Sequence, residues 1–504
     1  MTYTVLGNPA YKFGNTSRLW GSDAANDPVV YWAIEIDWTN AGTYDGSNEA
    51  QYCIDMEVTR GRPNKLSVDS NGNADGFSLS RIGTARLVFD NSSRRFDPYY
   101  TSSPLYGYIL PGRYIKIRAT YHGVTYPVFH GNIKSINPVE GENPTVILEC
   151  EDGMRLIQNA TSSLSITTDV NPPDAIQAIL TELEWPTRFG TNLDVYGVSG
   201  DIAYFWTSGN ALNEIKEICK TRPSNFWVAA TGAATNYRIV TTNGTMGTTI
   251  SESNTLKQIA LPVPWEEIKN YFKSYYTPRV VVTATPIFTL AEVTSIAATG
   301  SETRWGDYTY NNEQVPAINI ITPVATTDFT ANTLADGTGT DLTASFSVAV
   351  TDFGDNAKIV ISNNHPTLAG FITFLQVRGD AVTTQGRGYQ LNSEADSIAK
   401  YGRHDFVTDS KFVQNYYTAN IMLNWCRHLR SNRPNIEVQI DARPDVQFDA
   451  ELFKLAPVDI SKYAIDEDRT IGYINHKWVE PNGQRTVTTL ILEVIPVDPA
   501  PPFS

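Results

Sequence analysis

The sequence predicts a multidomain, mainly β protein with α+β elements: two small related antiparallel β-barrels, a small α/β unit and an inserted β-sandwich. Three observations predict this fold class. Short strands alternate with polar turns between residues 82 and 152, which is typical of small antiparallel barrels. Part of this pattern recurs near the C-terminal end of the sequence. Residues 280–389 contain Thr-, Ala- and Val-rich strands with few charges, as sandwich strands do.

Length and composition fit several assembled domains. A chain of 504 residues is too long for a single core. Only 18% of the residues are charged, below the roughly one-quarter of an average soluble protein. The polar surface instead relies on Thr, Ser, Asn and Gly, which suits exposed β structure and large assembled interfaces. We expect an N-terminal arm (1–50), a first barrel (51–158), a small α/β domain (159–279), the inserted sandwich (280–389), a connector with a long helix (390–430), and a second barrel with a C-terminal tail (431–504).

The N-terminal part is expected to contribute one strand before the first barrel. Residues 1–50 are rich in Gly, Asn, Asp and aromatic residues, and the strand-like run 29–36 predicts an arm or edge strand that packs on a neighbour. Within the first barrel, Ile115 and Ile117 alternate with Lys116, the period-two pattern of a half-buried strand. The following His-Gly pair is expected to turn the chain into a returning strand.

Two helices are expected in the α/β unit. Pro172 begins the first helix with Asn171 as its N-cap, and the helix stops before Pro186. The second begins at residues 208–210, ends before Pro223 and leads into a buried strand.

The connector after the sandwich is expected to hold a long helix at about 409–430. Asp409 is its predicted N-cap. Arg427, His428 and Arg430 fall in the last turn, where cations suit the helix dipole.

The two barrel blocks share a pattern at their ends. Each has glycine, one residue and isoleucine, starting at Gly131 and at Gly472, then a Pro/Glu/Gly turn and an aliphatic strand ending in Glu149 or Glu493. We interpret this as an internal duplication of the barrel, with coincidence as the alternative. The duplication predicts that Gly131 and Gly472 occupy matching places.

The first block also carries a family resemblance. The run DNSSRRFDP, followed by SPLYGYILPGRYIKIRA, FHGNI and VILECED, resembles hub and minor tail proteins at the tip of tailed bacteriophages. The stretch at 396–402 before the long helix resembles the same family. The resemblance implies two related barrels per chain and a homotrimeric ring of six barrels, which matches a six-fold tail tube to a three-fold tip. It implies as partners the tail tube or distal tail protein, the tape measure protein and other tail-tip proteins.

The sequence carries no catalytic signature. HExxH, GxSxG, P-loop and helix-opening GxGxxG motifs are missing, so we expect no enzyme and no catalytic, cofactor-binding or metal-binding residues. Neither histidines nor cysteines have ligand spacing, and the cysteines are expected to be buried free thiols. The histidines are His122, His130, His365, His404, His428 and His476, and the cysteines are Cys53, Cys150, Cys219 and Cys426.

Three charged motifs receive structural interpretations. Glu266-Glu267 is expected on a solvated helix face, because adjacent helical carboxylates point in different directions and do not form a glycosidase pair. Asp466-Glu467-Asp468 lacks the spacing of a calcium loop and is expected at a hairpin tip. Arg378-Gly379-Asp380 matches a cell-adhesion tripeptide, but it recurs by chance and is expected in a turn.

Charge and hydropathy restrict partners and location. A net charge of −15 disfavours general nucleic-acid binding and is compatible with a pore through which DNA passes. The N-terminus has no signal-peptide pattern, and the apolar run Val280-Val281-Val282 is too short to span a bilayer. We therefore expect a virion protein of the tail tip that is assembled in the host cytoplasm.

Two alternatives to a baseplate hub remain. One is a distal tail protein with six copies in a ring. The other is a secreted carbohydrate-binding or carbohydrate-active protein, since 10 Trp and 26 Tyr residues supply surfaces that stack on sugars. In the hub interpretation the sandwich projects outward and is the expected place for contacts with tip proteins or a host surface glycan.

Overall fold

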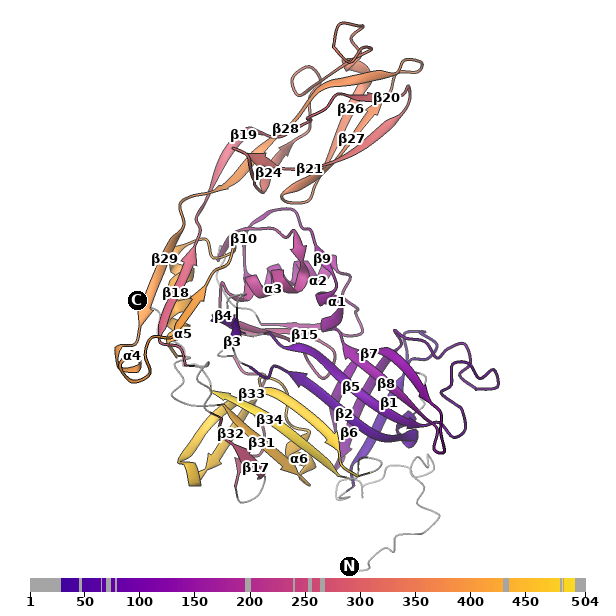
Figure 1. The fold of residues 1–504 in the computed structure, drawn as a ribbon, viewed down its shortest axis with the longest axis vertical. Helices are drawn as coiled ribbons and strands as arrows, with labels where there is room; N and C mark the ends of the chain where they lie inside the picture. The colour runs from indigo at the N-terminus through magenta and orange to yellow at the C-terminus, as the bar shows by residue number, and fades with distance from the viewer. Residues whose placement is uncertain are drawn as a thin grey trace, which may run out of the picture.

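The structure is a computed structural model that describes residues 29–44, 48–64, 66–68, 74–77, 79–194, 201–238, 241–252, 256–262, 268–428, 435–480, 483 and 485–494. Figure 1 shows two curled sheets side by side at the bottom, helices above them, and an elongated β lobe at the top. The protein is mainly β and multidomain, so the predicted fold class is confirmed.

Six strands form the first curled sheet, which we call the first half-barrel. Their order in the sheet is β1-β6-β7-β8-β5-β2. Inward-facing residues such as Leu87, Ile117 and Leu148 alternate with outward ones and fill a core. His122 and Gly123 both have positive φ and make the expected tight turn between β6 and β7. The strands are β1 (Tyr31–Ile36), β2 (Cys53–Gly61), β5 (Arg81–Asp90), β6 (Tyr114–Tyr121), β7 (Val124–Val139) and β8 (Thr145–Asp152).

The strand-like run forms an edge strand, which is one of the two predicted alternatives, but it packs on its own chain and is not an arm. Its residues form β1, which pairs with β6 of the same chain from Tyr31–Thr120 to Ile36–Ile115. Alternate residues of β1 are buried in the first core, so the half-barrel needs this strand. Residues 1–28 lie outside the described residues.

The second half-barrel repeats this topology. Its sheet order is β16-β32-β33-β34-β31-β17, and its six strands follow the same chain order as those of the first half-barrel. One pairing differs, because β16 runs parallel to β32 whereas β1 is antiparallel to β6. The strands are β16 (Ile250–Ser251), β17 (Leu256–Ala260), β31 (Ile436–Asp441), β32 (Leu455–Ile460), β33 (Ile465–Trp478) and β34 (Thr486–Val494).

A shared β-bulge fixes how the two half-barrels correspond. In β7 the pairing with β8 shifts between Ile133 and Ser135, and in β33 the pairing with β34 shifts between Ile471 and Tyr473. The bulged residues are therefore Lys134 and Gly472. Gly131 and Gly472 lie on equivalent strands but three positions apart in register, so the prediction of matching glycines is wrong.

The half-barrels are joined into one sheet. β2 pairs antiparallel with β33, and within the described residues the strand-pairing path runs from β1 to β17 without closing. Two separate cores lie inside the two curled halves.

A small α/β unit lies above the half-barrels (Figure 1). Asn171 precedes α2 as predicted, although its side chain makes no capping hydrogen bond, and Asn210 caps α3 by accepting from the amide of Asn213. The elements are α1 (Met154–Gln158), β9 (Thr161–Ser162), β10 (Thr167–Val170), α2 (Pro172–Glu182), β11 (Thr191–Leu193), β12 (Ile202–Phe205), β13 (Gly209–Asn210), α3 (Ala211–Cys219), β14 (Ser224–Val228) and β15 (Ala234–Arg238).

A five-stranded sheet, β29-β18-β30-β4-β3, is covered by α5. This helix begins at Tyr416 and not at the predicted N-cap Asp409; the side chain of Asn415 accepts from the amide of Thr418 instead. Asp409 pairs with Arg387 of the segment before β29. The elements are β3 (Leu66–Val68), β4 (Ala74–Phe77), β18 (Tyr271–Tyr276), β29 (Gly388–Ser393), α4 (Ala395–Tyr401), β30 (Asp405–Thr408) and α5 (Tyr416–His428).

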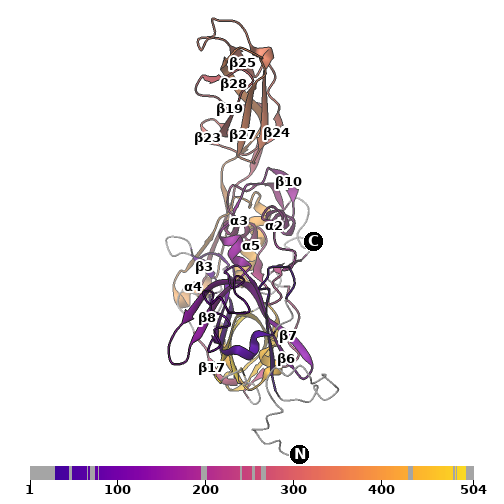
Figure 2. The ribbon, with the colours of Figure 1, turned by 90° about the vertical axis from the view of Figure 1, so that its right-hand side faces the viewer.

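The lobe is a β-sandwich with its own core. One sheet is built around β28 and the other has the order β21-β27-β26. Both views show the lobe extending away from the rest of the molecule (Figures 1 and 2). The strands are β19 (Arg279–Thr289), β20 (Thr294–Ile296), β21 (Ser301–Asp307), β22 (Thr309–Tyr310), β23 (Glu313–Gln314), β24 (Ala317–Ile321), β25 (Phe329–Asn332), β26 (Phe346–Asp352), β27 (Asn356–Asn363) and β28 (Gly370–Thr384).

Two of the predicted motif positions are wrong. Asp466-Glu467-Asp468 lies within β33, paired with β32, and the hairpin tip is instead the short 3-10 turn Ser461–Tyr463. Arg378-Gly379-Asp380 lies within β28, where Arg378 forms an ion pair with buried Asp328. Glu266-Glu267 lies outside the described residues.

Candidate assembly interface

The joint between the half-barrels begins with an antiparallel ladder of five residue pairs, from Glu57–Lys477 to Gly61–Tyr473. Gly61 has φ +96°, and a Cβ atom there would lie 2.2 Å from the carbonyl oxygen of Gly472. The next amide, that of Arg62, donates to this same carbonyl at 2.8 Å. Glycine at position 61 therefore permits the close approach of the two backbones.

A buried ion pair lies beside this ladder. The Arg62 guanidinium donates to both carboxylate oxygens of Glu493, at 2.9 and 2.6 Å, and the two side chains are only 1% and 3% exposed. The guanidinium also lies 5.1 Å from the ring centre of Phe453. Such bidentate geometry fixes the orientation of the two groups as well as their separation.

A second ion pair extends the joint to the α/β unit. Arg60 donates to both oxygens of Glu451, at 2.6 and 3.1 Å. Glu451 also accepts from the backbone amide of Ala230, which follows β14. One carboxylate thus links the first half-barrel, the second half-barrel and the α/β unit.

Aromatic side chains close the other end of the joint. The segment between β31 and β32 contains α6 (Pro444–Gln447), and Phe448 directly after it is 4% exposed. Its ring lies 5.2 Å from Trp32 of β1, 6.4 Å from Tyr126 of β7 and 5.6 Å from His476 of β33. This segment of the second half-barrel therefore packs into the first.

Three buried titratable groups of the two half-barrels have shifted pKa values. Burial lowers the pKa of His476 to about 3, and its ring makes a hydrogen bond with Thr488. Burial lowers the pKa of His130 to about 4. Burial raises the pKa of Asp152 to about 7, although the amides of Gly83 and Met154 donate to its carboxylate. The two histidines are neutral at physiological pH and serve as packed hydrogen-bonding groups.

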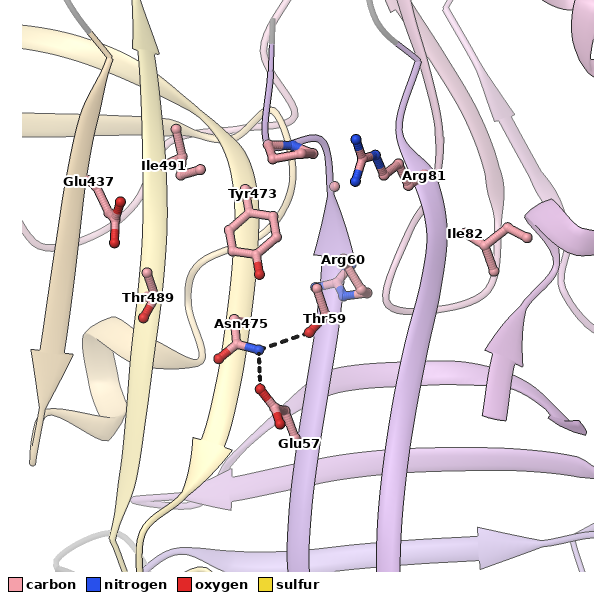
Figure 3. A pocket seen from close by; sticks show the side chains of 12 residues that line it. Glu57, Thr59, Arg60, Arg81, Ile82, Glu437, Tyr473, Asn475, Thr489 and Ile491 are labelled. Atoms are coloured by element: carbon pink, nitrogen blue, oxygen red, sulfur yellow. Dashed lines mark hydrogen bonds between the residues drawn. The ribbon is translucent and has the colours of Figure 1, made fainter. Parts of the chain in front are cut away.

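An open groove of about 500 Å³ lies over the ladder (Figure 3). In it the Asn475 amide donates to Glu57 at 3.0 Å and to Thr59 at 2.8 Å, so these polar groups hold β33 against β2 (Figure 3). The lining residues include no Ser, Cys or His, and in the part of the chain that the structure describes no three His, Cys, Asp or Glu side chains could hold a metal ion. The groove offers hydrogen-bonding and charged side chains, among them Glu57, Arg81 and Glu437.

The sequence predicts no catalytic, cofactor or metal site, and it carries no local signal for the joint between the half-barrels. Glu493 stands in the sequence only as the end of an aliphatic strand, and its partner Arg62 lies 431 residues away. Cys53, Cys150 and Cys219 are free and buried, and burial raises the pKa of each thiol. The side chain of Cys426 lies outside the described residues. Among the described residues, no helix has the length and apolar character needed to cross a membrane.

Two solved structures resemble this chain along almost its whole length. The 43 kDa tail protein of prophage MuSo2 from Shewanella oneidensis aligns with a TM-score of 0.50 at 9% identity, covering 93% of this chain and 98% of that chain. The tail protein from Neisseria meningitidis MC58 aligns with a TM-score of 0.50 at 7% identity, with the same coverage. No protein-family model matches the chain, and no curated protein matches it significantly in sequence. The expected resemblance to phage tail proteins is thus confirmed at the level of the fold.

Proposed function

We propose that this chain is a structural virion protein of a phage tail tip, in which three copies form a baseplate hub. The observation that carries the proposal is the six-strand duplication within one chain, joined by the β2–β33 ladder. It is supported by the fold shared with a prophage tail protein and with a second tail protein along almost the whole chain.

The duplication gives the ring its symmetry. A ring needs equivalent contacts between neighbouring units. Two similar half-barrels per chain and three chains supply six units for a six-fold tail tube. The parts without a duplicate, namely the α/β unit, the α5-covered sheet and the lobe, then repeat only three times.

The partners follow from this position. The six-unit side would contact the tail tube or a distal tail protein, and the three-fold side would contact other tip proteins and the tape measure protein. The net charge of −15 suits a channel through which DNA passes, because acidic walls do not hold phosphate. Assembly in the host cytoplasm and incorporation into the virion complete the proposal, and no reaction is part of it.

Native mass measurement of the assembled protein, together with imaging of purified particles, tests the copy number. Three copies in a ring with six half-barrels support the hub. Six copies in one ring would contradict it and favour a distal tail protein. A monomer that binds sugars and never enters a particle would favour a secreted carbohydrate-binding protein.

The lobe is proposed to contact a host surface glycan through the outer face of its three-stranded sheet. Trp305 on β21 is 63% exposed, and Phe353 supports its ring at 5.4 Å. Exposed indole rings stack on the apolar faces of sugars, and Lys358, the cross-strand neighbour of Trp305, supplies a hydrogen-bond donor. We expect Trp305→Ala to abolish binding to host-surface polysaccharide, whereas Val324→Ala, at another exposed apolar position of the lobe, should leave it unchanged.

A further inference from the structure

The loop between β5 and β6, residues 91–113, presents large apolar side chains to solvent. Tyr99 is 85% exposed, Tyr106 49%, Tyr108 46% and Leu110 47%. Tyrosines are enriched where protein surfaces bind one another. An exposed cluster of this kind is therefore a candidate contact surface.

The loop is held in shape by its own contacts. Phe96 is fully buried in the first core, and its amide donates to the side chain of Asn91. The amide of Tyr99 donates to Asp97, and the hydroxyl of Ser103 donates to the carbonyl of Arg95. The tyrosines are thus presented by an ordered loop, which reduces the entropy lost on binding.

The internal duplication identifies the counterpart of this loop. β5 and β6 correspond to β31 and β32, so the counterpart is the segment that contains α6 and Phe448. That segment is covered, because Phe448 packs against Trp32 and Tyr126 of the first half-barrel. One copy of the duplicated connection therefore has a partner within the chain, and the other exposes its aromatic side chains.

We propose that loop 91–113 docks onto the second half-barrel of a neighbouring copy of this chain, as the α6 segment docks onto the first half-barrel of its own chain. This inference rests on the proposed ring and adds the surfaces that close it. We choose a second copy as the partner because the chain already contains one example of this contact, between its second and its first half-barrel. The same contact between the first half-barrel of one copy and the second half-barrel of the next would continue the ring.

The receiving surface follows from the same correspondence. Trp32 lies on β1 and Tyr126 on β7 just after the β6–β7 turn, so their counterparts are β16 and the start of β33 after the β32–β33 turn. At that turn Tyr463 is 46% exposed, with the Lys462 ammonium 5.7 Å from its ring centre. The receiving surface thus offers an exposed ring and a cation to the tyrosines of the loop.

The strand ladder contributes less at this second joint. In the contact between copies, β7 would take the place of β33 and β17 the place of β2. The corresponding part of β7 contains Pro138, and Pro262 follows shortly after β17. Because proline has no N–H to donate, β7 and β17 cannot repeat the full hydrogen-bond ladder that joins β2 and β33. Side-chain contacts from loop 91–113 must therefore supply most of the specificity between copies.

Site-specific photocrosslinking tests the contact in the assembled full-length protein. The photoreactive residue p-benzoylphenylalanine replaces Tyr99 in one preparation and Tyr389, exposed on β29, in a control. We expect the Tyr99 position to crosslink to residues of β16 or the β32–β33 turn in another copy, identified by mass spectrometry of the crosslinked peptides. A ring whose crosslinks from Tyr99 reach only other surfaces, or none, would overturn the docking inference while leaving the ring intact. A protein that stays monomeric at all concentrations would instead refute the proposed ring, and the inference with it.

A matched pair of variants gives an independent measurement. The double variant Tyr99→Ser/Tyr108→Ser removes two exposed rings from the loop, and Tyr389→Ser/Tyr416→Ser removes two exposed rings elsewhere. We expect the loop variant to self-associate at least about tenfold more weakly by analytical ultracentrifugation, as loss of interface hot spots does, while both variants keep the thermal stability of the wild type. Equal association of the loop variant and the wild type would refute the contact.

Discussion

Arg62 and Glu493 illustrate how single residues set the angle between the two half-barrels. Both are almost completely buried, so neither charge has bulk water as an alternative partner. Their two parallel hydrogen bonds are satisfied only when β2 and β34 keep their present relation. The pair therefore selects one arrangement of the halves more than it adds net stability.

Replacing only Arg62 should lower the free energy of unfolding more than replacing both Arg62 and Glu493. We expect Arg62→Met to lower the free energy of unfolding by about 3–5 kcal/mol, because Glu493 then stays buried without its guanidinium partner. The double variant Arg62→Met/Glu493→Leu should recover much of this loss. Denaturant unfolding of the three proteins measures both effects, and a double variant as unstable as the sum of the single variants would contradict the explanation.

Asp152 should make stability depend on pH. Burial raises its pKa in the folded state to about 7, above the roughly 3.9 of an unfolded chain, despite the nearby Arg60 guanidinium. Because the folded-state pKa is the higher one, the stabilisation given by the protonated group is complete below about pH 4. It is lost as the pH rises through about 7.

The comparison with Asp152→Asn isolates this dependence. Between pH 5 and 7 the unfolding free energy of the wild type should fall relative to that of the variant by about 1.4 kcal/mol per pH unit, and above about pH 8 the difference should be constant. Chemical denaturation at a series of pH values measures it. A difference between the two proteins that does not change with pH would show that Asp152 is ionised throughout.

At the scale of elements, the joint depends on the close approach of β2 and β33. Gly61 has φ +96° and no room for a Cβ atom, whereas Gly112 has φ +86° and nothing within 4 Å. Gly112→Ala should cost about 1–2 kcal/mol for the backbone conformation alone. Gly61→Ala should cost more than about 4 kcal/mol because a steric clash is added. Thermal unfolding of both variants measures the two losses of stability. Equal losses would show that the close approach of the backbones at Gly61 adds no steric cost.

Local signals predicted the elements that depend on local chemistry. Pro172 and Asn171 mark the start of α2, and the His122-Gly123 pair marks a tight turn, because each of these residues directly restricts the backbone. Asp409 has the same apparent signal but is used elsewhere: its side chain pairs with Arg387 and its carbonyl accepts from Lys220. A helix N-cap can be predicted only when no tertiary contact competes for the residue.

The sequence predicts which strands of the two half-barrels correspond, but it does not predict which residues on those strands correspond. The shared glycine–isoleucine pattern identified the right strands, yet Gly472 occupies the bulge position that Lys134 fills in β7. A bulge shifts the register by one residue without leaving a fixed residue type in the sequence. The joint itself had no local signal, because the partners Arg62 and Glu493 belong to opposite ends of the chain.

At the scale of the whole molecule, the lobe is an insertion. The rest of the described chain, which we call the body, is held together without it. The chain leaves from β18 and returns into β29, which pair with each other from Tyr271–Ser393 to Tyr276–Gly388. Arg279 and Thr384 are paired at the base of the lobe. The two ends of this insertion are therefore already held together by the body.

Deleting residues 280–383 and joining Arg279 to Thr384 through a short Gly-Ser linker should leave the body folded. The lobe has its own core. It touches the α/β unit where the Ser165 hydroxyl donates to the carbonyl of Asp352 and where Gly354 packs closely on Trp206. Arg279, kept in the variant, still covers Trp206, whose ring centre lies 5.0 Å from the guanidinium. The shortened protein should show an unchanged melting temperature for the body and the copy number of the full chain by native mass measurement. Aggregation of the shortened chain, or loss of its ring, would mean that the lobe belongs to the assembly interface rather than projecting from it.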